Sequence, residues 1–191
     1  LAGNLTSADV IDGGEGTDTL SLTSAGFAVI DGYDVSTANI LNGNLSNVEK
    51  LTVSDQFNTG VDMDMGRLAG ITSITLNDGI SGNESFTGLA ASSTVTSKQD
   101  NAADSDILTL ALASTAGTTD TLTYAMSGPA GNDHFGVVAV SGVETLNVSG
   151  NEATASATVR TYEVDLTITT STYGTTVNFS GAEAITIGAA I

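Results

Sequence analysis

Apolar and polar residues alternate with a period of two along most of the chain, and helical periodicity is scarce. Successive side chains of a β-strand point to opposite faces, so this alternation predicts strands with one buried face. Strands are predicted at residues 19–23, 27–30, 94–96, 107–112, 121–126, 137–140, 157–170 and 175–179. Only residues 34–41 suit a short helical turn. We therefore expect an all-β fold.

A short template repeats along the chain, and each copy predicts a further strand. It consists of a turn followed by apolar, acidic, any, apolar, polar and apolar residues. Three copies contain the glutamate, at residues 48–53, 143–148 and 182–187, and residues 71–76 form a looser copy. The last three positions place two apolar side chains on one strand face. The first apolar residue is expected to dock the incoming turn.

The predicted strands are spaced irregularly, at intervals of roughly 20 residues, which suits the coils of a β-solenoid or the hairpins of a β-sandwich. Asp-Gly or Asn-Gly turns separate several of them. We predict an irregular parallel β-solenoid with calcium loops, with a β-sandwich as the alternative. The 191 residues are expected to form a single all-β domain or a fragment of a longer chain, with residues 1–100 and 101–191 as candidate sub-halves.

Residues 13–21 (GGEGTDTLS) combine two adjacent glycines, a spaced third glycine, an aspartate and an apolar residue. Glycine permits a sharp turn that gathers carbonyl oxygens, and Asp18 adds a charged oxygen. Calcium selects hard oxygen ligands of this kind. Asp9 and Ile11 precede Asp18 and Leu20 by one repeat length. The segment therefore predicts a calcium-binding loop, and an ordinary Gly-Asp turn is the alternative.

Other segments repeat parts of this pattern. Residues 128–136 (GPAGNDHFG) match it except that Pro129 replaces the second glycine and removes its conformational freedom, so this copy is the weaker candidate for a calcium site. Asp106 and Asp120 each begin an aspartate-any-apolar triplet without the glycines. In residues 61–65, two aspartates share one strand face, which favours a solvated acidic face over a cation clamp.

The charge is strongly acidic: 22 acidic residues oppose 4 basic ones, giving a net charge of −18. No basic patch exists for nucleic acid or for an anionic membrane, which argues against both partners. Self-repulsion of this size is offset by salt or by bound cations, so it supports calcium independently, although adaptation to high salt would produce the same composition. A hydrophobic content of 40% with 14% charged residues predicts a folded chain.

Cysteine is absent, so a secreted chain of this kind must be held by packing, by metal or by its neighbours. No run of 18 apolar residues exists, which argues against membrane insertion. The chain starts at Leu1 and carries no signal peptide pattern, so we expect an internal piece of a longer chain or a processed product.

Catalysis has little support in the sequence. The only histidine, His134, lies beside Asp133, and nothing marks a strained nucleophile turn. One histidine and no cysteine argue against zinc. Aromatic residues make up 5% and tryptophan is absent, which argues against the aromatic-lined groove of a polysaccharide enzyme. We therefore expect a protein that is not an enzyme.

The nonapeptide and the glutamate template together resemble RTX-type bacterial surface-layer proteins and related type I-secreted adhesins. The resemblance is specific at residues 9–21 and in the three glutamate-containing repeats, of which residues 140–148 are especially similar to the strand repeats of that family. It implies an exported, calcium-binding protein that tiles the bacterial cell surface. By analogy, the calcium ligands are Asp9, Asp12, Gly13, Glu15, Thr17 and Asp18, and more weakly Gly128, Asn132 and Asp133. This chain lacks the long repeat arrays of the family.

Assembly is also expected on physical grounds. Soluble monomeric β-proteins protect edge strands with lysine and proline, whereas this chain has only Lys50, Lys98 and Pro129. We expect a structural component of a secreted, calcium-dependent bacterial surface layer that self-assembles outside the cell. Other parts of the parent chain would contact cell-surface polysaccharide. The alternatives are a module of a type I-secreted adhesin, a filament subunit and a polysaccharide-modifying enzyme.

Overall fold

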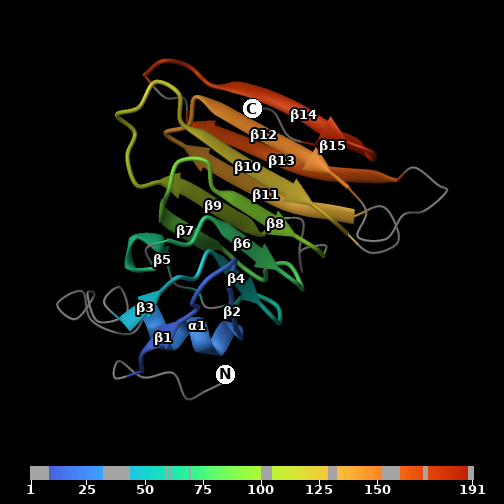
Figure 1. Cartoon of the computed structure of the whole chain (residues 1–191). Coiled ribbons are helices and arrows are strands. Elements are labelled where there is room, and N and C mark those ends of the chain that lie inside the picture. The colour runs from blue at the N-terminus through green and yellow to red at the C-terminus, as the bar shows by residue number, and fades with distance from the viewer. Residues whose placement is uncertain are drawn as a thin grey trace.

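The computed structural model describes residues 9–31, 44–58, 60, 62–68, 70–99, 105–128, 133–151, 160–169 and 172–188. Within these ranges the fold consists mainly of parallel β-strands (Figure 1). A helix, α1 (Ser24–Asp31), lies at the N-terminal end of the stack of strands, and a 3-10 turn, η1 (Met65–Arg67), follows one strand. The expected all-β class is confirmed.

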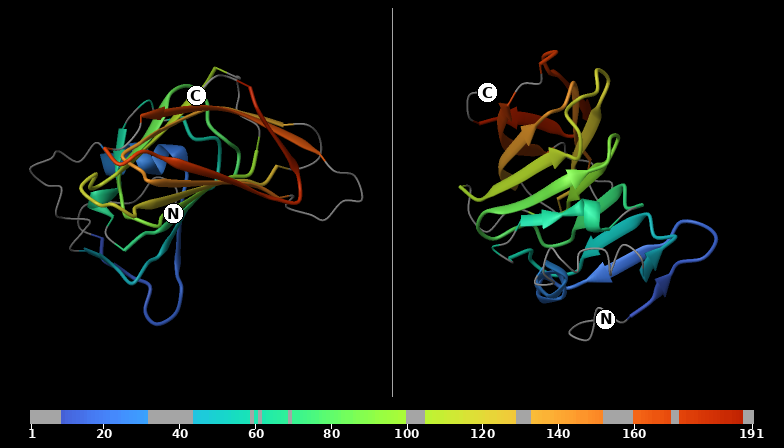
Figure 2. Two further views of the ribbon diagram at one scale, coloured as in Figure 1. Left: turned by 90° about the horizontal axis from the view of Figure 1, so that it is seen from above. Right: turned by 90° about the vertical axis from the view of Figure 1, so that its left-hand side faces the viewer.

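Two parallel sheets face each other across one core (Figure 2). The first sheet has seven strands, which in spatial order are β14 (Thr176–Gly181), β12 (Thr145–Gly150), β10 (Thr121–Met126), β8 (Thr94–Ser97), β6 (Ser73–Leu76), β4 (Lys50–Val53) and β2 (Thr19–Leu22). The second sheet has six strands, in the order β15 (Ala184–Ile187), β13 (Thr161–Thr169), β11 (Asp133–Ser141), β9 (Ile107–Leu112), β7 (Glu84–Leu89) and β5 (Asp62–Asp64). A smaller parallel pair joins β1 (Ile11–Asp12) to β3 (Leu45–Ser46).

From β4 onward the chain alternates between the two sheets, so two successive strands make one coil. This alternation with parallel pairing is the arrangement of a β-solenoid, and it confirms that prediction over the β-sandwich alternative. Both sheets continue across residue 100, because β8 pairs with β10 and β7 pairs with β9.

The core is built from apolar side chains that occupy equivalent positions in successive coils. In the first sheet Leu51 lies opposite Ile74, Ile74 opposite Val95, and Val95 opposite Tyr124. All four side chains are buried. The number of residues between partners varies because the turns differ in length, whereas the inward-facing positions stay in register. Burial raises the pKa of Tyr124, because the ionised phenolate would lose its hydration there.

The glutamate template marks strand entries, as predicted. Its copies lead into β4, β12, β15 and β6. Val48 and Val143, the first apolar residues of two copies, are buried at the turn, which confirms that they dock the incoming chain. The copy at residues 182–187 enters the second sheet, whereas the other three enter the first sheet.

Residues 27–30, predicted as a strand, belong to α1, so that prediction is wrong. The Thr23 hydroxyl accepts a hydrogen bond from the Gly26 amide at 3.2 Å, which is a helix N-cap interaction. Phe27 is buried, and its ring packs edge-on against Phe57 with centroids 5.5 Å apart. The cap and this aromatic contact outweigh the strand-like composition. The helical turn predicted at residues 34–41 lies outside the described residues.

Strand β7 was not predicted, because its pairing is interrupted. The register with β9 shifts between Phe86 and Leu89, and Gly88 there has a φ of 65°. A β-bulge of this kind breaks the alternation on which strand prediction depends. By contrast, the amphipathic pattern predicted at residues 61–65 is borne out over residues 62–65 by β5 and η1, in which Met63 and Met65 are buried, while residue 61 lies outside the described residues.

The carboxylates of β5 have partners within the chain. Asp62 accepts a hydrogen bond from the Ser85 hydroxyl at 2.5 Å, and Asp64 accepts one from the Gly66 amide at 2.9 Å. Asp62 is exposed and Asp64 is partly exposed, which fits the predicted solvated acidic face of an amphipathic strand.

The last described coil differs from the coils before it. Its inward-facing residues are only partly covered: Phe179 is 48% exposed, and Val177, Ile185 and Ile187 are half-buried. At the opposite end, α1 contacts β2 and β5, and Phe27 is buried beneath it. The two ends of the described stack are therefore unequal.

Truncating the aromatic stack near α1 should destabilise the whole fold. Phe57 is fully buried and stacks on Phe86 with centroids 5.2 Å apart. We expect Phe57→Ala to lower the free energy of unfolding by about 3–5 kcal/mol, measured by chemical denaturation. Phe179→Ala, at the half-exposed position, is the control and should cost much less. Equal losses would contradict this description of the core.

Candidate functional site

The loop after β1 is organised around Asp12. Its Oδ1 accepts hydrogen bonds from the Asn47 amide group at 2.7 Å and from the Gly14 backbone amide at 3.0 Å. The hydrogen bond from Asn47, followed by that from Gly14, lowers the pKa of Asp12. Asn47 is in reach because β1 and β3 pair in parallel, with Ile11 opposite Leu45.

Asp18 lies at the other end of this loop, against Gly13. A Cβ atom on Gly13 would lie 2.7 Å from the Asp18 Cβ and 1.9 Å from the Asn47 carbonyl oxygen, so only glycine fits. The Asp18 Oδ2 atom is shielded from solvent and accepts no hydrogen bond. The structure therefore brings Gly13 and Asp18 together, as the nonapeptide pattern predicts.

The remaining predicted ligands of this loop do not converge as side chains. Asp9 is half-buried, while Glu15 and Thr17 are exposed. Within the described residues, no three carboxylates of this loop bring ligand atoms within 4.8 Å of one another. Calcium binding by the loop thus depends on backbone carbonyls as well as on Asp18, and it stays a prediction.

Asp18 is also joined to the next coil through Glu49. The Asp18 amide donates to Glu49 Oε2 at 2.9 Å, and the amides of Glu49 and Lys50 donate back to the Asp18 carbonyl at 3.3 and 3.0 Å. We call this reciprocal arrangement a turn pair. In a turn pair, the residue before one strand is hydrogen-bonded to the glutamate before the neighbouring strand. It ties two coils together at the entrance to the sheet.

The turn pair recurs at two further places. The Asp120 amide donates to Glu144 Oε2 at 2.9 Å, and the amides of Glu144 and Thr145 donate to the Asp120 carbonyl at 3.1 and 3.0 Å. The Arg160 amide donates to Glu183 Oε2, and the Ala184 amide donates to the Arg160 carbonyl at 2.9 Å. The three glutamates are those of the repeated template. Sequence reasoning missed this role, although the glutamate recurs at the same position of each copy.

The second nonapeptide copy shares one glycine–aspartate contact with the first. A Cβ atom on Gly128 would lie 1.9 Å from Asp133 Oδ2, so Gly128 and Asp133 are in contact as Gly13 and Asp18 are. Asn132 lies outside the described residues. Asp133 begins β11 in the second sheet, whereas Asp18 precedes β2 in the first, so the two copies do not stack on each other.

A cluster that sequence reasoning did not predict forms on β11 and β13. One potential ligand atom from each of His134, Glu163 and Asp165 lies within 4.8 Å of the others. His134 Nε2 lies 3.8 Å from Glu163 Oε1, and its Nδ1 accepts the Gly136 amide at 3.0 Å. An accepting Nδ1 leaves the imidazole proton on Nε2, so this nitrogen cannot also bind a metal. The cluster therefore suits a hydrogen-bonded polar contact better than a metal centre.

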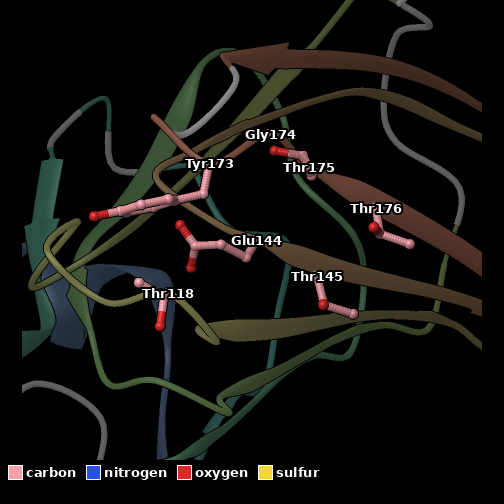
Figure 3. Close-up of a pocket in the computed structure, with 7 residues that line it drawn as sticks. All are labelled: Thr118, Glu144, Thr145, Tyr173, Gly174, Thr175 and Thr176. Atoms are coloured by element: carbon pink, nitrogen blue, oxygen red, sulfur yellow. The ribbon is translucent and has the colours of Figure 1, made fainter.

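An open hollow of about 410 Å³ lies beside the second turn pair (Figure 3). Glu144 lines it and is only 8% exposed, whereas Tyr173 at its edge is 63% exposed. Its other lining residues are mainly hydroxyl-bearing: Thr118, Thr145, Gly174, Thr175 and Thr176. The hollow thus combines one buried carboxylate with hydroxyl groups and one aromatic ring.

The strands of the first sheet carry no acidic residue, although the whole chain has a charge of −18. Their outward-facing side chains are mostly Thr, Ser and Asn, and Asn178 donates to Asn147 at 3.0 Å. Lys50 is the one charged residue in these strands. Carboxylates are instead concentrated in the turns and on the second sheet.

Comparisons with protein-family models, with curated protein sequences and with solved structures gave no match. No helix among the described residues has both the length and the apolar character needed to cross a membrane.

Replacing Gly13 should disrupt the loop that holds Asp18. We expect Gly13→Ala to lower the free energy of unfolding by about 2 kcal/mol, because the new Cβ would overlap the Asn47 carbonyl oxygen. Gly26→Ala is the matched control: its Cβ would have no contact closer than 3.5 Å, so it should stabilise α1 by about 0.5–1 kcal/mol. Denaturation curves that move in the same direction for both variants would refute the proposed loop geometry.

The Asn47 hydrogen bond should be visible in the titration of Asp12. A lowered pKa in the folded chain means that the ionised carboxylate stabilises the loop. This stabilisation is present above the ordinary aspartate pKa of about 3.9 and is lost as the pH falls through the lower folded value. We expect Asn47→Ala to raise the Asp12 pKa, measured by NMR titration. Asn178→Ala, which removes a bond to Asn147 instead, should leave it unchanged.

Proposed function

We propose that this chain is a structural component of a secreted, calcium-dependent bacterial surface layer of the RTX type. In this proposal copies of the chain associate outside the cell, and calcium stabilises the loop at residues 12–18. The proposal assigns no catalytic residue. The observation that carries it is the loop at residues 12–18, where Gly13 lies against Asp18 and the shielded Asp18 Oδ2 accepts no hydrogen bond among the described residues.

The edges of the last described coil are suited to pairing. β14 and β15 are the edge strands of their sheets, and they contain no lysine, proline or acidic residue. Edge strands without such protection present unpaired backbone groups to another strand. Further strands added here, by a second copy or by another part of the parent chain, would bury Phe179, Val177, Ile185 and Ile187.

The distribution of charge also supports association of copies through one face of the molecule. Two chains that each carry a charge of −18 repel each other, so close approach needs a face without carboxylates or a bridging cation. The outward face of the first sheet meets the first condition. Calcium at the acidic turns meets the second by reducing the net charge.

Calcium bound at the loop of residues 12–18 would order the start of the first sheet. Gly13 lets the backbone approach Asp18, and the shielded Asp18 Oδ2 has no donor among the residues that the structure describes. A cation bound there by this oxygen and by loop carbonyls would hold the start of β2 against β4. Extracellular sites of this kind bind calcium with a Kd of about 0.1–1 mM, which suits the proposed location.

Phe179→Lys should weaken assembly without unfolding the chain, because it places a charge on an exposed edge strand. In millimolar calcium we expect the unmodified chain to form large particles that chelator disperses, measured by sedimentation and light scattering. Phe179→Lys should stay much smaller under the same conditions.

Val10→Lys is the control, because Val10 is 75% exposed at the opposite end of the stack. It should assemble as the unmodified chain does. The proposal fails if the unmodified chain is equally monomeric in chelator and in calcium, or if Phe179→Lys assembles normally.

A further inference from the structure

The structure assigns a second cation site to the hollow beside Asp120 and Glu144, outside both nonapeptide copies. We infer that Glu144 binds a hard divalent cation such as calcium there. This inference does not rest on the surface-layer proposal, since it concerns a different loop and needs no assembly.

The Glu144 carboxylate is buried, and only one of its two oxygens has a hydrogen-bond partner. The residue is 8% exposed, and its Oε2 accepts the Asp120 amide. Its Oε1 is shielded from solvent and has no hydrogen-bond partner. An ionised oxygen in this position needs either a donor or a cation, because it has lost its water.

The backbone amides of Glu144 and Thr145 and the hydroxyl of Thr175 are engaged elsewhere. The backbone amides of Glu144 and Thr145 donate to the Asp120 carbonyl. The Thr175 hydroxyl donates to the Val143 carbonyl at 2.7 Å, so its proton does not serve Glu144. A cation would satisfy Oε1, and the surrounding hydroxyl oxygens can coordinate it as further ligands.

The hollow beside Glu144 has room for a cation and for its further ligands. Figure 3 shows the Glu144 carboxylate directed towards the side of the hollow where Tyr173 and Thr118 lie. The hollow, of about 410 Å³, leaves room for water molecules to complete the coordination of a cation. Its lining contains no basic side chain that would compete with a cation for the carboxylate.

The loop that contains Asp120 shares several contacts with the nonapeptide loop. Asp120 stands to Glu144 as Asp18 stands to Glu49, with the same three hydrogen bonds in the same sheet. Gly117 packs against Asp120 as Gly13 packs against Asp18, since a Cβ on Gly117 would lie 2.1 Å from Asp120 Oδ2. The shielded carboxylate oxygen without a donor is Asp18 Oδ2 in the first pair and Glu144 Oε1 in the second. The Asp120 loop therefore shares the hydrogen bonds and the glycine contact of the nonapeptide loop, with a different glycine spacing and with the free oxygen on the glutamate.

Terbium luminescence can test the site, because Tb³⁺ replaces calcium at oxygen-rich sites and is sensitised by a nearby tyrosine. Tyr173 lines the hollow, so it should sensitise an ion bound at Glu144. We expect the unmodified chain to show luminescence on tyrosine excitation that calcium displaces. Tyr173→Phe should remove this component. Glu144→Gln, which keeps an oxygen for the Asp120 amide, should weaken Tb³⁺ binding by about tenfold or more because the ligand charge is lost.

Glu183→Gln is the matched control. Glu183 occupies the same position in a turn pair, but Arg160 replaces the aspartate, so Tb³⁺ binding should be unchanged. Asp18→Asn should leave the Tyr173-dependent component intact, which separates this site from the nonapeptide loop. Circular dichroism checks that each variant is folded.

The inference is overturned if Tyr173→Phe leaves the luminescence unchanged, or if folded Glu144→Gln binds Tb³⁺ as tightly as the unmodified chain. If Glu144→Gln does not fold, the comparison of Tyr173→Phe with the unmodified chain is sufficient to test the inference. Failure of the surface-layer proposal would instead appear as assembly that does not respond to calcium.

Discussion

In-register stacking of parallel coils is the constraint on which the rest of this structure depends. Each inward-facing residue must fit the residue at the same position in the coils on either side, as Leu51, Ile74 and Val95 do. The same register applies to the turns that precede the strands. A residue type placed before one strand is therefore brought beside its counterpart in the next coil, whatever its charge.

This constraint creates a conflict in so acidic a chain, because carboxylates at equivalent turns come together. At two turn pairs an aspartate stands beside a glutamate, namely Asp18 with Glu49 and Asp120 with Glu144. Backbone amides satisfy one oxygen of each glutamate. The shielded oxygens without a donor are Asp18 Oδ2 in the first pair and Glu144 Oε1 in the second. Cations bound at these two oxygens would lower the repulsion and hold neighbouring coils together.

Much of the fold was predictable because strand alternation and the glutamate template are local signals. The predicted strand at residues 107–112 coincides with β9, and that at residues 121–126 coincides with β10. α1 was missed because its cap and the Phe27 contact with Phe57 depend on residues brought together by folding. β7 was missed because a bulge at Gly88 interrupts its pattern.

The candidate sites were predictable only in part. The nonapeptide pattern assigned Gly13 and Asp18 to one calcium loop, and the two residues lie in contact there, while the calcium itself stays a prediction. The role of Glu49 and Glu144 required the register between coils, because Glu49 is 31 residues from its partner and Glu144 is 24 from its own. Spacing that varies in this way cannot be read from a fixed repeat length.

Amide hydrogen exchange, followed residue by residue with and without calcium, tests the central claim most directly. The claim is that cations at the acidic turn pairs hold neighbouring coils together. Calcium should slow the exchange of the Asp18 and Asp120 amides, while the Arg160 amide, whose turn pair has no aspartate, should exchange at an unchanged rate. Equal slowing of all three amides, or of none, would contradict the account.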